Sequence, residues 1–283
     1  MLIDTHCHLD AAEFSADRDA VFRDGVAAGV RASVIPAVAT ATFPEVRTCC
    51  LAYPGCFPAY GIHPLYAPQA REEDLDTLRR WLTAERDGPR PPVAVGEIGL
   101  DLYVPELAQG PARERQEHFF AAQLRIARDF DLPVILHVRR AVDPILQQLR
   151  RCPPRGGIAH AFNGSRQQAE AFLKLGFKLG FGGAMTFPGS TRIRELAATL
   201  PLEALVLETD APDIPPAFLG PDSPDRRNKP EYLPRFAAQL AELRDMDAAA
   251  LIAATAANAR AALPGLAALP PGPSPTPALP PQQ

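Results

Sequence analysis

The amino-acid sequence predicts a single-domain α/β protein with the architecture of a TIM-like (β/α)8 barrel. Short apolar runs alternate eight times with longer amphipathic stretches along the chain, and this is the pattern of repeated strand–helix units. The predicted strands are apolar throughout, as expected for a parallel sheet that is buried on both faces. A doubly wound open sheet is the alternative, but no GxGxxG sequence follows the first strand.

The predicted strands begin at the N-terminus and recur up to residue 210. In chain order they are LIDTHC (2–7), ASVIPAV (32–38), FPAYGIH (57–63), VAVGEIGL (93–100), LPVILHV (132–138), GIAHAF (157–162), KLGFGG (178–183) and LVLETD (205–210). Amphipathic periodicity predicts helices between them, over 16–29, 72–85, 113–130, 143–151, 165–176 and 191–200.

A long polar connection, residues 211–230, follows the last predicted strand and leads to two further predicted helices, 231–245 and 247–263. Residues 264–283 are rich in proline, carry no charged side chain and show no periodicity. We therefore predict a barrel domain over 1–263 and a disordered, Pro-rich tail over 264–283.

Composition restricts the class of protein. The chain has 283 residues, of which 47% are hydrophobic and 22% are charged, as in a soluble protein large enough for one barrel. No apolar run approaches the roughly 20 residues of a membrane-spanning helix, and the N-terminus lacks the pattern of a secretory signal. The five cysteines include no CxxC pair, which argues against a disulfide framework. We expect a cytoplasmic protein that does not bind membranes, with a monomer as the default.

Net charge limits how the protein could hold a polyanion. The formal net charge is −4 and the pI is near 5.9, so bulk electrostatics do not attract nucleic acid. A local site has to supply the attraction, and bound divalent cations could do so.

Histidines gather at the C-terminal ends of the predicted strands, which hold five of the six in the chain. His6 and His8 are two residues apart on the first strand, so their side chains point the same way and can share a metal ion. In barrel enzymes this face carries the active site. The complete set of chemically active residues at these ends is His6, His8, His63, Glu97, His137, His160 and Asp210.

Imidazole and carboxylate ligands together suit zinc, manganese or magnesium. Four histidines and two carboxylates exceed the needs of one tetrahedral ion but suffice for two divalent metal ions with a shared carboxylate. Glu97 is the expected bridge because a carboxylate offers two oxygens. One ion is then assigned His6, His8 and Asp210, and the other His137 and His160.

A series of short motifs covers nearly the whole chain except the Pro-rich tail: DTHCHLD, YGIHP, GEIGLD, LPVILHVRRA, GIAHAFNGS, GGAMTFP and LVLETDAPD. With these motifs in this order, the chain resembles the TatD-like metal-dependent hydrolases (TatD DNase family) of the amidohydrolase superfamily. The resemblance implies a TIM-like barrel, a divalent metal centre and hydrolysis of phosphodiester bonds in DNA, often from the 3′ end. The family's ligand positions fall on the six residues assigned above, and its phosphate-contacting histidine falls on His63.

Two motifs depart from the family pattern. HAFNGS has Ala161 and Asn163 where Cys and Ser are expected, and HVRRA has Arg140 where a small or acidic residue is common. Neither departure removes a ligand, but both bear on the substrate that the pocket fits.

We expect a hydrolase acting on ester bonds, with DNA or RNA as its substrate and with Glu97, Asp210 and His63 as its catalytic residues. Asp210 would orient the attacking water and accept its proton. His63 would donate to a phosphate oxygen or to the leaving group. Arg139 or Arg140 would clamp phosphate.

Other interpretations remain open from the sequence. The same ligands could serve hydrolysis of an amide or of another ester, such as the aminoacyl linkage of a D-aminoacyl-tRNA. A metal-stabilised binding protein without turnover is a third possibility. RRNK (226–229) could contact a nucleic-acid backbone, although a solvated loop is favoured. The glycines of GFGG (180–183) are expected to allow close packing rather than to cradle phosphate.

Overall fold

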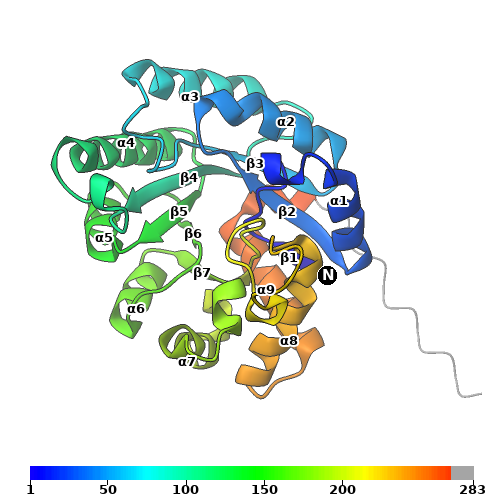
Figure 1. The fold of residues 1–283 in the computed structure, drawn as a ribbon. Helices are drawn as coiled ribbons and strands as arrows, with labels where there is room; N and C mark the ends of the chain where they lie inside the picture. The colour runs from blue at the N-terminus through cyan, green and yellow to red at the C-terminus, as the bar shows by residue number, and fades with distance from the viewer. Residues whose placement is uncertain (269–283) are drawn as a thin grey trace, which may run out of the picture.

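The structure is a computed structural model that describes residues 1–268. Eight parallel strands form one sheet in which each strand pairs with the next along the chain, from β1 to β8. The sheet curls into a barrel with helices on its outside (Figure 1). Backbone contacts close the seam, because Thr5 N donates to Leu207 O at 3.1 Å and Cys7 forms a bridge with Ala211. The predicted TIM-like barrel is confirmed.

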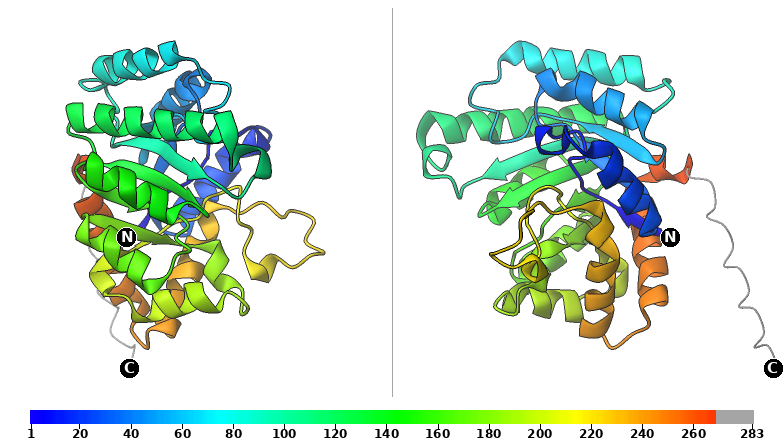
Figure 2. Two further views of the ribbon diagram at one scale, coloured as in Figure 1. Left: turned by 90° about the vertical axis from the view of Figure 1, so that its left-hand side faces the viewer. Right: turned by 45° about the vertical axis from the view of Figure 1, so that its right-hand side comes forward.

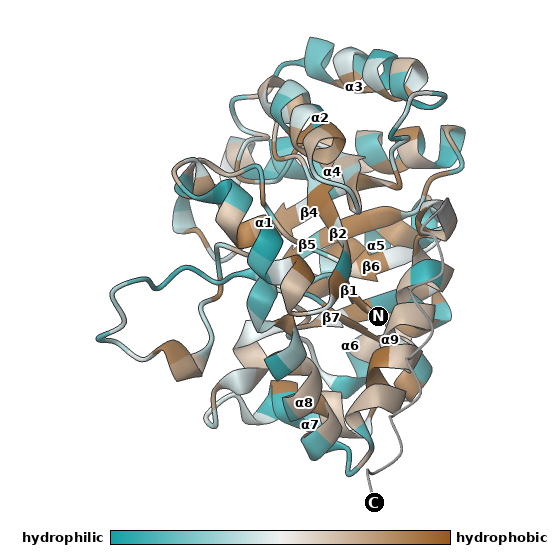
Figure 3. Cartoon of the chain, turned by 90° about the vertical axis from the view of Figure 1, so that its right-hand side faces the viewer, coloured by the Kyte–Doolittle hydropathy of each residue, from teal (hydrophilic) through white to brown (hydrophobic). Residues whose placement is uncertain are grey.

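Each predicted strand overlaps an observed strand. The strands are β1 Leu2–Asp4, β2 Val30–Pro36, β3 Cys56–Tyr60, β4 Ala94–Asp101, β5 Val134–Arg139, β6 Gly157–Ala159, β7 Phe177–Phe181 and β8 Leu205–Leu207. They stand out as brown, apolar ribbons in the interior of Figure 3. Several are shorter than predicted, because the residues that carry the site chemistry continue past the last ladder hydrogen bond.

The helices follow the strands in the predicted alternation. They are α1 Arg18–Ala27, α2 Phe43–Ala52, α3 Glu72–Glu85, α4 Gly110–Asp129, α5 Val142–Arg151, α6 Arg166–Lys174, α7 Thr191–Thr199, α8 Leu233–Leu243 and α9 Ala248–Ala262. Local signals set some ends. Ser165 caps α6 by accepting from Gln168 N, and Asp247 caps α9 by accepting from Ala250 N. α2 was not among the predicted helices.

The hydrophobic core has two main parts. The larger lies between the strands and the outer helices and includes Phe120 of α4 and Phe236 of α8. The second contains small and aliphatic strand residues such as Ile3 and Val206, together with Ala259 of α9. Because Leu263 and Leu266, which follow α9, share this cluster with Val93, the residue before β4, this segment closes the N-terminal end of the barrel. The opposite end of the barrel, where the strands have their C-terminal ends, contains the pocket with the predicted site residues.

The chain around residue 264 differs from the predicted tail boundary. Pro264–Ala268 form a 3-10 helix, and the side chain of Leu266 is buried in the second core cluster. The remaining residues of the predicted tail lie outside the described residues. Within residues 1–268, no helix is both long enough and apolar enough to cross a membrane.

The long connection between β8 and α8 projects from the end of the barrel that carries the site (Figure 2, yellow). Its two ends are tied together behind the site, because the buried Asn228 side chain donates to Thr209 O at 2.6 Å and to Ile214 O at 3.1 Å. Arg227 contacts Asp17 and Asp225, and Lys229 contacts Asp225. Arg227 and Lys229 of RRNK are therefore engaged in ion pairs within the chain.

Candidate metal centre

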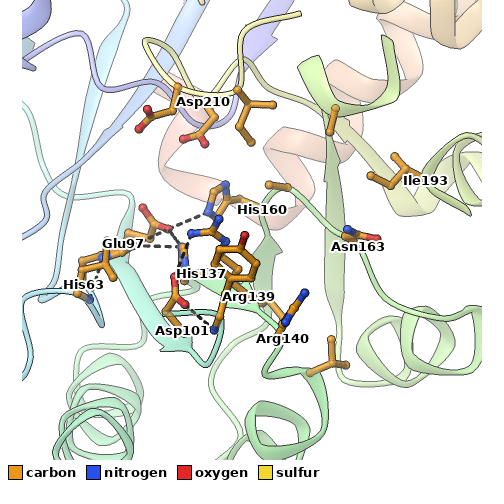
Figure 4. Close-up of a pocket in the computed structure, with 18 of the residues that line it drawn as sticks. His63, Glu97, Asp101, His137, Arg139, Arg140, His160, Asn163, Ile193 and Asp210 are labelled. Carbon is orange, nitrogen blue, oxygen red and sulfur yellow. Dashed lines mark hydrogen bonds and ion pairs between the residues drawn. The ribbon is translucent and has the colours of Figure 1, made fainter. Parts of the chain in front are cut away.

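The predicted site residues converge at the C-terminal end of the barrel, in a pocket of about 770 Å³ (Figure 4). Its lining includes all the predicted site residues except His6, which is fully buried at its floor. His118, by contrast, lies on α4 with half of its side chain exposed and pairs with Glu72 at 3.0 Å. The barrel topology thus brings together residues that are separated by more than two hundred positions, as His6 and Asp210 are.

The segment after β1 carries His6 and His8. Their Nε2 atoms lie 3.1 Å apart, and His6 Nε2 is also 3.4 Å from Asp210 Oδ1. Asp4 holds this segment against the chain that carries Asp210, because it accepts from Thr209 N at 2.9 Å and from Thr209 Oγ1 at 2.6 Å. The seam between β1 and β8 therefore fixes three of the predicted ligands relative to one another.

Glu97 lies at the centre of the cluster. Its Oε1 is 2.8 Å from His160 Nε2 and 2.9 Å from His137 Nδ1, whereas its Oε2 is 3.1 Å from His6 Nε2. Glu97 was counted among the residues at the strand ends, but it lies within its strand, because β4 continues to Asp101. The ladder between β4 and β5 shifts register between Val95 and Ile98, so the irregularity, and not the strand end, is where Glu97 enters the pocket.

The donor atoms form three overlapping groups, each within 4.8 Å. These are His6 with His8 and Glu97; His6 with His160 and Asp210; and His63 with Glu97 and His137. The grouping differs from the predicted division in two respects. His160 lies beside His6, with ring centroids 4.0 Å apart, and His63 joins the second group, since its Nε2 is 3.0 Å from His137 Nδ1.

The chemistry of this donor set fits divalent metal ions. Ligand atoms at 2.0–2.1 Å from a tetrahedral ion lie about 3.3 Å from one another, and the distances given above are 2.8–3.4 Å. Two imidazole nitrogens that face each other need either a proton or a shared cation between their lone pairs. Glu97 offers one oxygen to each side, as a bridging carboxylate does.

Charge favours an ionised Glu97. Burial alone would raise the pKa of this carboxyl, but His160, His63 and His6 together hold its pKa well below the usual range. Burial raises the pKa of Asp210 to about 6, although His160 and His8 partly offset the effect. Glu97 is therefore an anion at neutral pH, whereas Asp210 titrates close enough to neutrality to exchange protons.

Two further carboxylates contact the histidines and were not identified from the sequence. Asp101 Oδ2 lies 3.1 Å from His137 Nε2, and Glu208 Oε1 lies 3.8 Å from His160 Nδ1. In both cases the other ring nitrogen faces Glu97. A carboxylate that is hydrogen-bonded in this position, as Asp101 is to His137, fixes the tautomer and orientation of a metal-binding histidine, whereas Glu208 lies beyond hydrogen-bond distance of His160. Strand periodicity could have identified Asp101. It stands four residues after Glu97 on the same strand, and an even spacing puts two side chains on the same face.

The glycines of GFGG make room for Glu208, which confirms their predicted packing role. A Cβ atom on Gly180 would lie 2.0 Å from Glu208 Oε2, and one on Gly182 would lie 2.3 Å from Glu208 O. β7 can therefore pass beside this buried carboxyl only with hydrogen atoms at these positions.

Arginines form one wall of the pocket. Arg139 and Arg140 place their guanidinium carbons 3.9 Å and 4.7 Å from the ring centroid of Tyr103. Arg192 also lines the pocket, and its Nη2 donates to Asn163 Oδ1 at 2.8 Å. Asn163, one of the departures from the family pattern, is thus engaged with an arginine, and sequence reasoning did not identify Arg192.

Comparison with known proteins agrees with this geometry. The model of the TatD related DNase family matches residues 3–264. The metal-dependent hydrolase YjjV of Escherichia coli K12 is 41% identical over 244 residues, which cover 86% of this chain and 90% of the relative. The 3′-5′ ssDNA/RNA exonuclease TatD of Pantoea sp. At-9b is 34% identical over 263 residues, which cover 92% and 98%.

A solved structure shows the same architecture. The crystal structure of YjjV, described as a TatD homologue from Escherichia coli K12, superposes with a TM-score of 0.85 at 38% identity and covers 93% of this chain and 98% of its own. A family match over almost all of the described residues, with relatives above 30% identity, establishes the relationship. The chain belongs to the TatD related DNase family.

Proposed function

We propose that the protein is a divalent-metal-dependent phosphodiesterase that removes nucleotides from an end of single-stranded DNA or RNA. One observation carries the proposal: Glu97 presents its two oxygens to different histidines at the floor of a pocket with an arginine wall. Relatives that are named 3′-5′ ssDNA/RNA exonucleases support the choice of bond and substrate.

Six residues would hold two ions of zinc, manganese or magnesium: His6, His8, Glu97, His137, His160 and Asp210. When bound, such ions supply an activated water and neutralise charge on the phosphoryl oxygens. His63 Nε2 lies 3.0 Å from His137 Nδ1 and 3.4 Å from Glu97 Oε1, which supports its proposed contact with a phosphate oxygen or the leaving group.

Asp210 is the proposed proton acceptor. It lies at the seam of the barrel with a left-handed backbone, φ 60°, and its side chain enters the pocket beside His6 and His160. Burial raises the pKa of this carboxyl, which makes it a stronger proton acceptor than an exposed aspartate. Arg139 and Arg140 would contact phosphates from the pocket wall.

The structure of one chain contains every residue of the proposed site, so we expect a monomer to be active. The five cysteines are free, and all but Cys152 are buried, which is compatible with our expectation of a reducing, cytoplasmic environment.

The test is hydrolysis by chelator-treated protein that is reloaded with manganese, magnesium or zinc. Substrates are single-stranded DNA and RNA labelled at either end, bis(p-nitrophenyl) phosphate and an aminoacyl-tRNA. We expect metal-dependent release of nucleotides from one end, its loss in Glu97→Gln, and its retention in the matched surface control His118→Ala. Cleavage of the aminoacyl ester alone, or no turnover of any phosphodiester, would overturn the proposal.

A further inference from the structure

Beside the metal centre, two arginine side chains pack against the exposed ring of Tyr103. Paired strands β4 and β5 extend the barrel wall as far as Asp101 and Arg139, and Tyr103 lies two residues beyond the end of β4. Nearly half of Tyr103 (48%) is exposed, although its ring lies under the guanidinium groups of Arg139 and Arg140. Tyr103 and both arginines line the same pocket as the predicted metal ligands.

The position of this ring is fixed through the site itself. Asp101 Oδ1 accepts from Tyr103 N at 2.8 Å, while Oδ2 of the same carboxylate contacts His137. Gln116 of α4 in turn holds the backbone of Asp101, since Asp101 N donates to Gln116 Oε1 at 2.8 Å. The aromatic ring and the metal centre are therefore held at a set separation by one buried carboxylate.

The two arginines are available to a ligand. Arg140 has φ 53°, a left-handed backbone that disfavours residues other than glycine by about 1 kcal/mol or more, and such outliers concentrate at functional sites. Within residues 1–268, no carboxylate forms an ion pair with Arg140 or with Arg192, which also lines the pocket. Arg139 has only a 3.7 Å contact with Asp101. The wall is thus cationic.

Guanidinium groups packed over an aromatic ring beside the metal centre match the chemistry of an unpaired nucleotide. Bases stack on aromatic rings and on guanidinium planes, and phosphates accept hydrogen bonds from arginine. A base within a duplex has both faces covered by its neighbours and cannot use such a surface.

We propose that Tyr103, Arg139 and Arg140 form a subsite for the nucleotide adjoining the scissile phosphate, and that this subsite selects single-stranded polynucleotides over small phosphodiesters and over duplexes. The proposal rests on the phosphodiesterase function proposed above. In this subsite, the ring of Tyr103 holds the two guanidinium groups in place, and the nucleobase stacks against this arrangement.

The test compares Tyr103→Leu, Tyr103→Phe and wild type on bis(p-nitrophenyl) phosphate and on a single-stranded hexanucleotide. We expect Tyr103→Leu to raise KM for the hexanucleotide about tenfold or more, with kcat within about twofold, and to raise KM for bis(p-nitrophenyl) phosphate far less. Tyr103→Phe should restore the wild-type KM. Phe187→Leu is the matched control, because Phe187 is similarly exposed (42%) but does not line the pocket.

Three results would contradict the proposed subsite. Equal effects of Tyr103→Leu on both substrates, or no effect on either, would overturn the subsite while leaving phosphodiesterase activity intact. Equal rates of wild type on single strand and duplex would do the same. If wild type hydrolyses neither substrate with any metal, the proposed function fails and the subsite with it. Melting temperatures of the variants, expected to stay within a few degrees of wild type, show that the half-exposed position tolerates substitution.

Discussion

Asp101 and Glu97 contact opposite nitrogens of the same ring: His137 Nε2 lies 3.1 Å from Asp101 Oδ2, and His137 Nδ1 lies 2.9 Å from Glu97 Oε1. Burial alone would raise the pKa of Asp101, but the contact with His137 lowers it to about 2. An ionised Asp101 favours a proton on Nε2 and leaves the Nδ1 lone pair free for the centre of the pocket.

Asp101→Asn is therefore expected to weaken metal binding by about 10- to 100-fold, because an amide no longer selects the tautomer of His137. Asparagine retains an oxygen that can accept from Tyr103 N, so the loop should stay in place. Titration of chelator-treated protein with a metal against a chromophoric chelator measures the effect. Asp131→Asn, which alters an exposed carboxylate paired with Arg155, is the control, and an unchanged affinity in Asp101→Asn would contradict the role assigned here.

Gly180 and Glu208 are expected to be energetically coupled, because the absent side chain of one makes room for the carboxyl of the other. Gly180→Ala should destabilise the protein by about 1–3 kcal/mol through overpacking. Glu208→Ala should recover part of this loss in the double variant. Urea unfolding of wild type, both single variants and the double variant gives the coupling free energy, and strictly additive effects would contradict the packing argument.

Gln123 supports the segment that carries His63. Its buried side chain accepts from Ile62 N at 2.7 Å and donates to Ile62 O at 3.0 Å. Gln123→Met keeps the side-chain size but leaves two buried backbone groups unpaired, so we expect a loss of about 1–3 kcal/mol for each. Urea unfolding checks this against Gln147→Met, an exposed position on α5; equal stability of the two variants would count against it.

The fold was predictable because its pattern is repetitive. Every strand of the barrel is covered on both faces, so apolar runs mark the strands even where they are only three residues long, as in β6 and β8. α2 escaped notice because its buried positions, Phe43, Val46, Cys49 and Cys50, include two cysteines and span little more than two turns. The irregularity of β4 at Glu97 was also missed, since a register shift between strands leaves no mark in one sequence.

The barrel topology predicted that the site residues converge, but it did not predict which donor atoms within the site face each other. A parallel barrel brings all C-terminal strand ends to one rim, which is enough to collect His6, Glu97, His160 and Asp210. Which donor faces which depends on barrel curvature: the rings of His6 and His160 stack although β1 and β6 are not adjacent. Likewise, nothing in the sequence distinguishes Tyr103 from other tyrosines until its arginine neighbours are in place.

The ion pairs of Arg227 predict a pH dependence of stability. Its guanidinium lies 2.6 Å from Asp17 and 2.8 Å from Asp225, and its hydrogen bonds hold the pKa values of both carboxyls below their ordinary range. A carboxyl with a lowered pKa in the folded state stabilises the fold above its unfolded pKa of about 4. That contribution is lost as the pH falls through the folded values.

Arg227→Met should therefore lower the melting temperature by a constant amount between pH 5 and 8, and the difference from wild type should shrink below about pH 4. Differential scanning fluorimetry across this range measures it. The adjacent Arg226, which is exposed and forms no ion pair within residues 1–268, provides the control Arg226→Met, which should follow wild type at every pH. A difference for Arg227→Met that persists undiminished at pH 3 would mean that packing of the side chain against Phe14, and not its ion pairs, ties the long loop to α1.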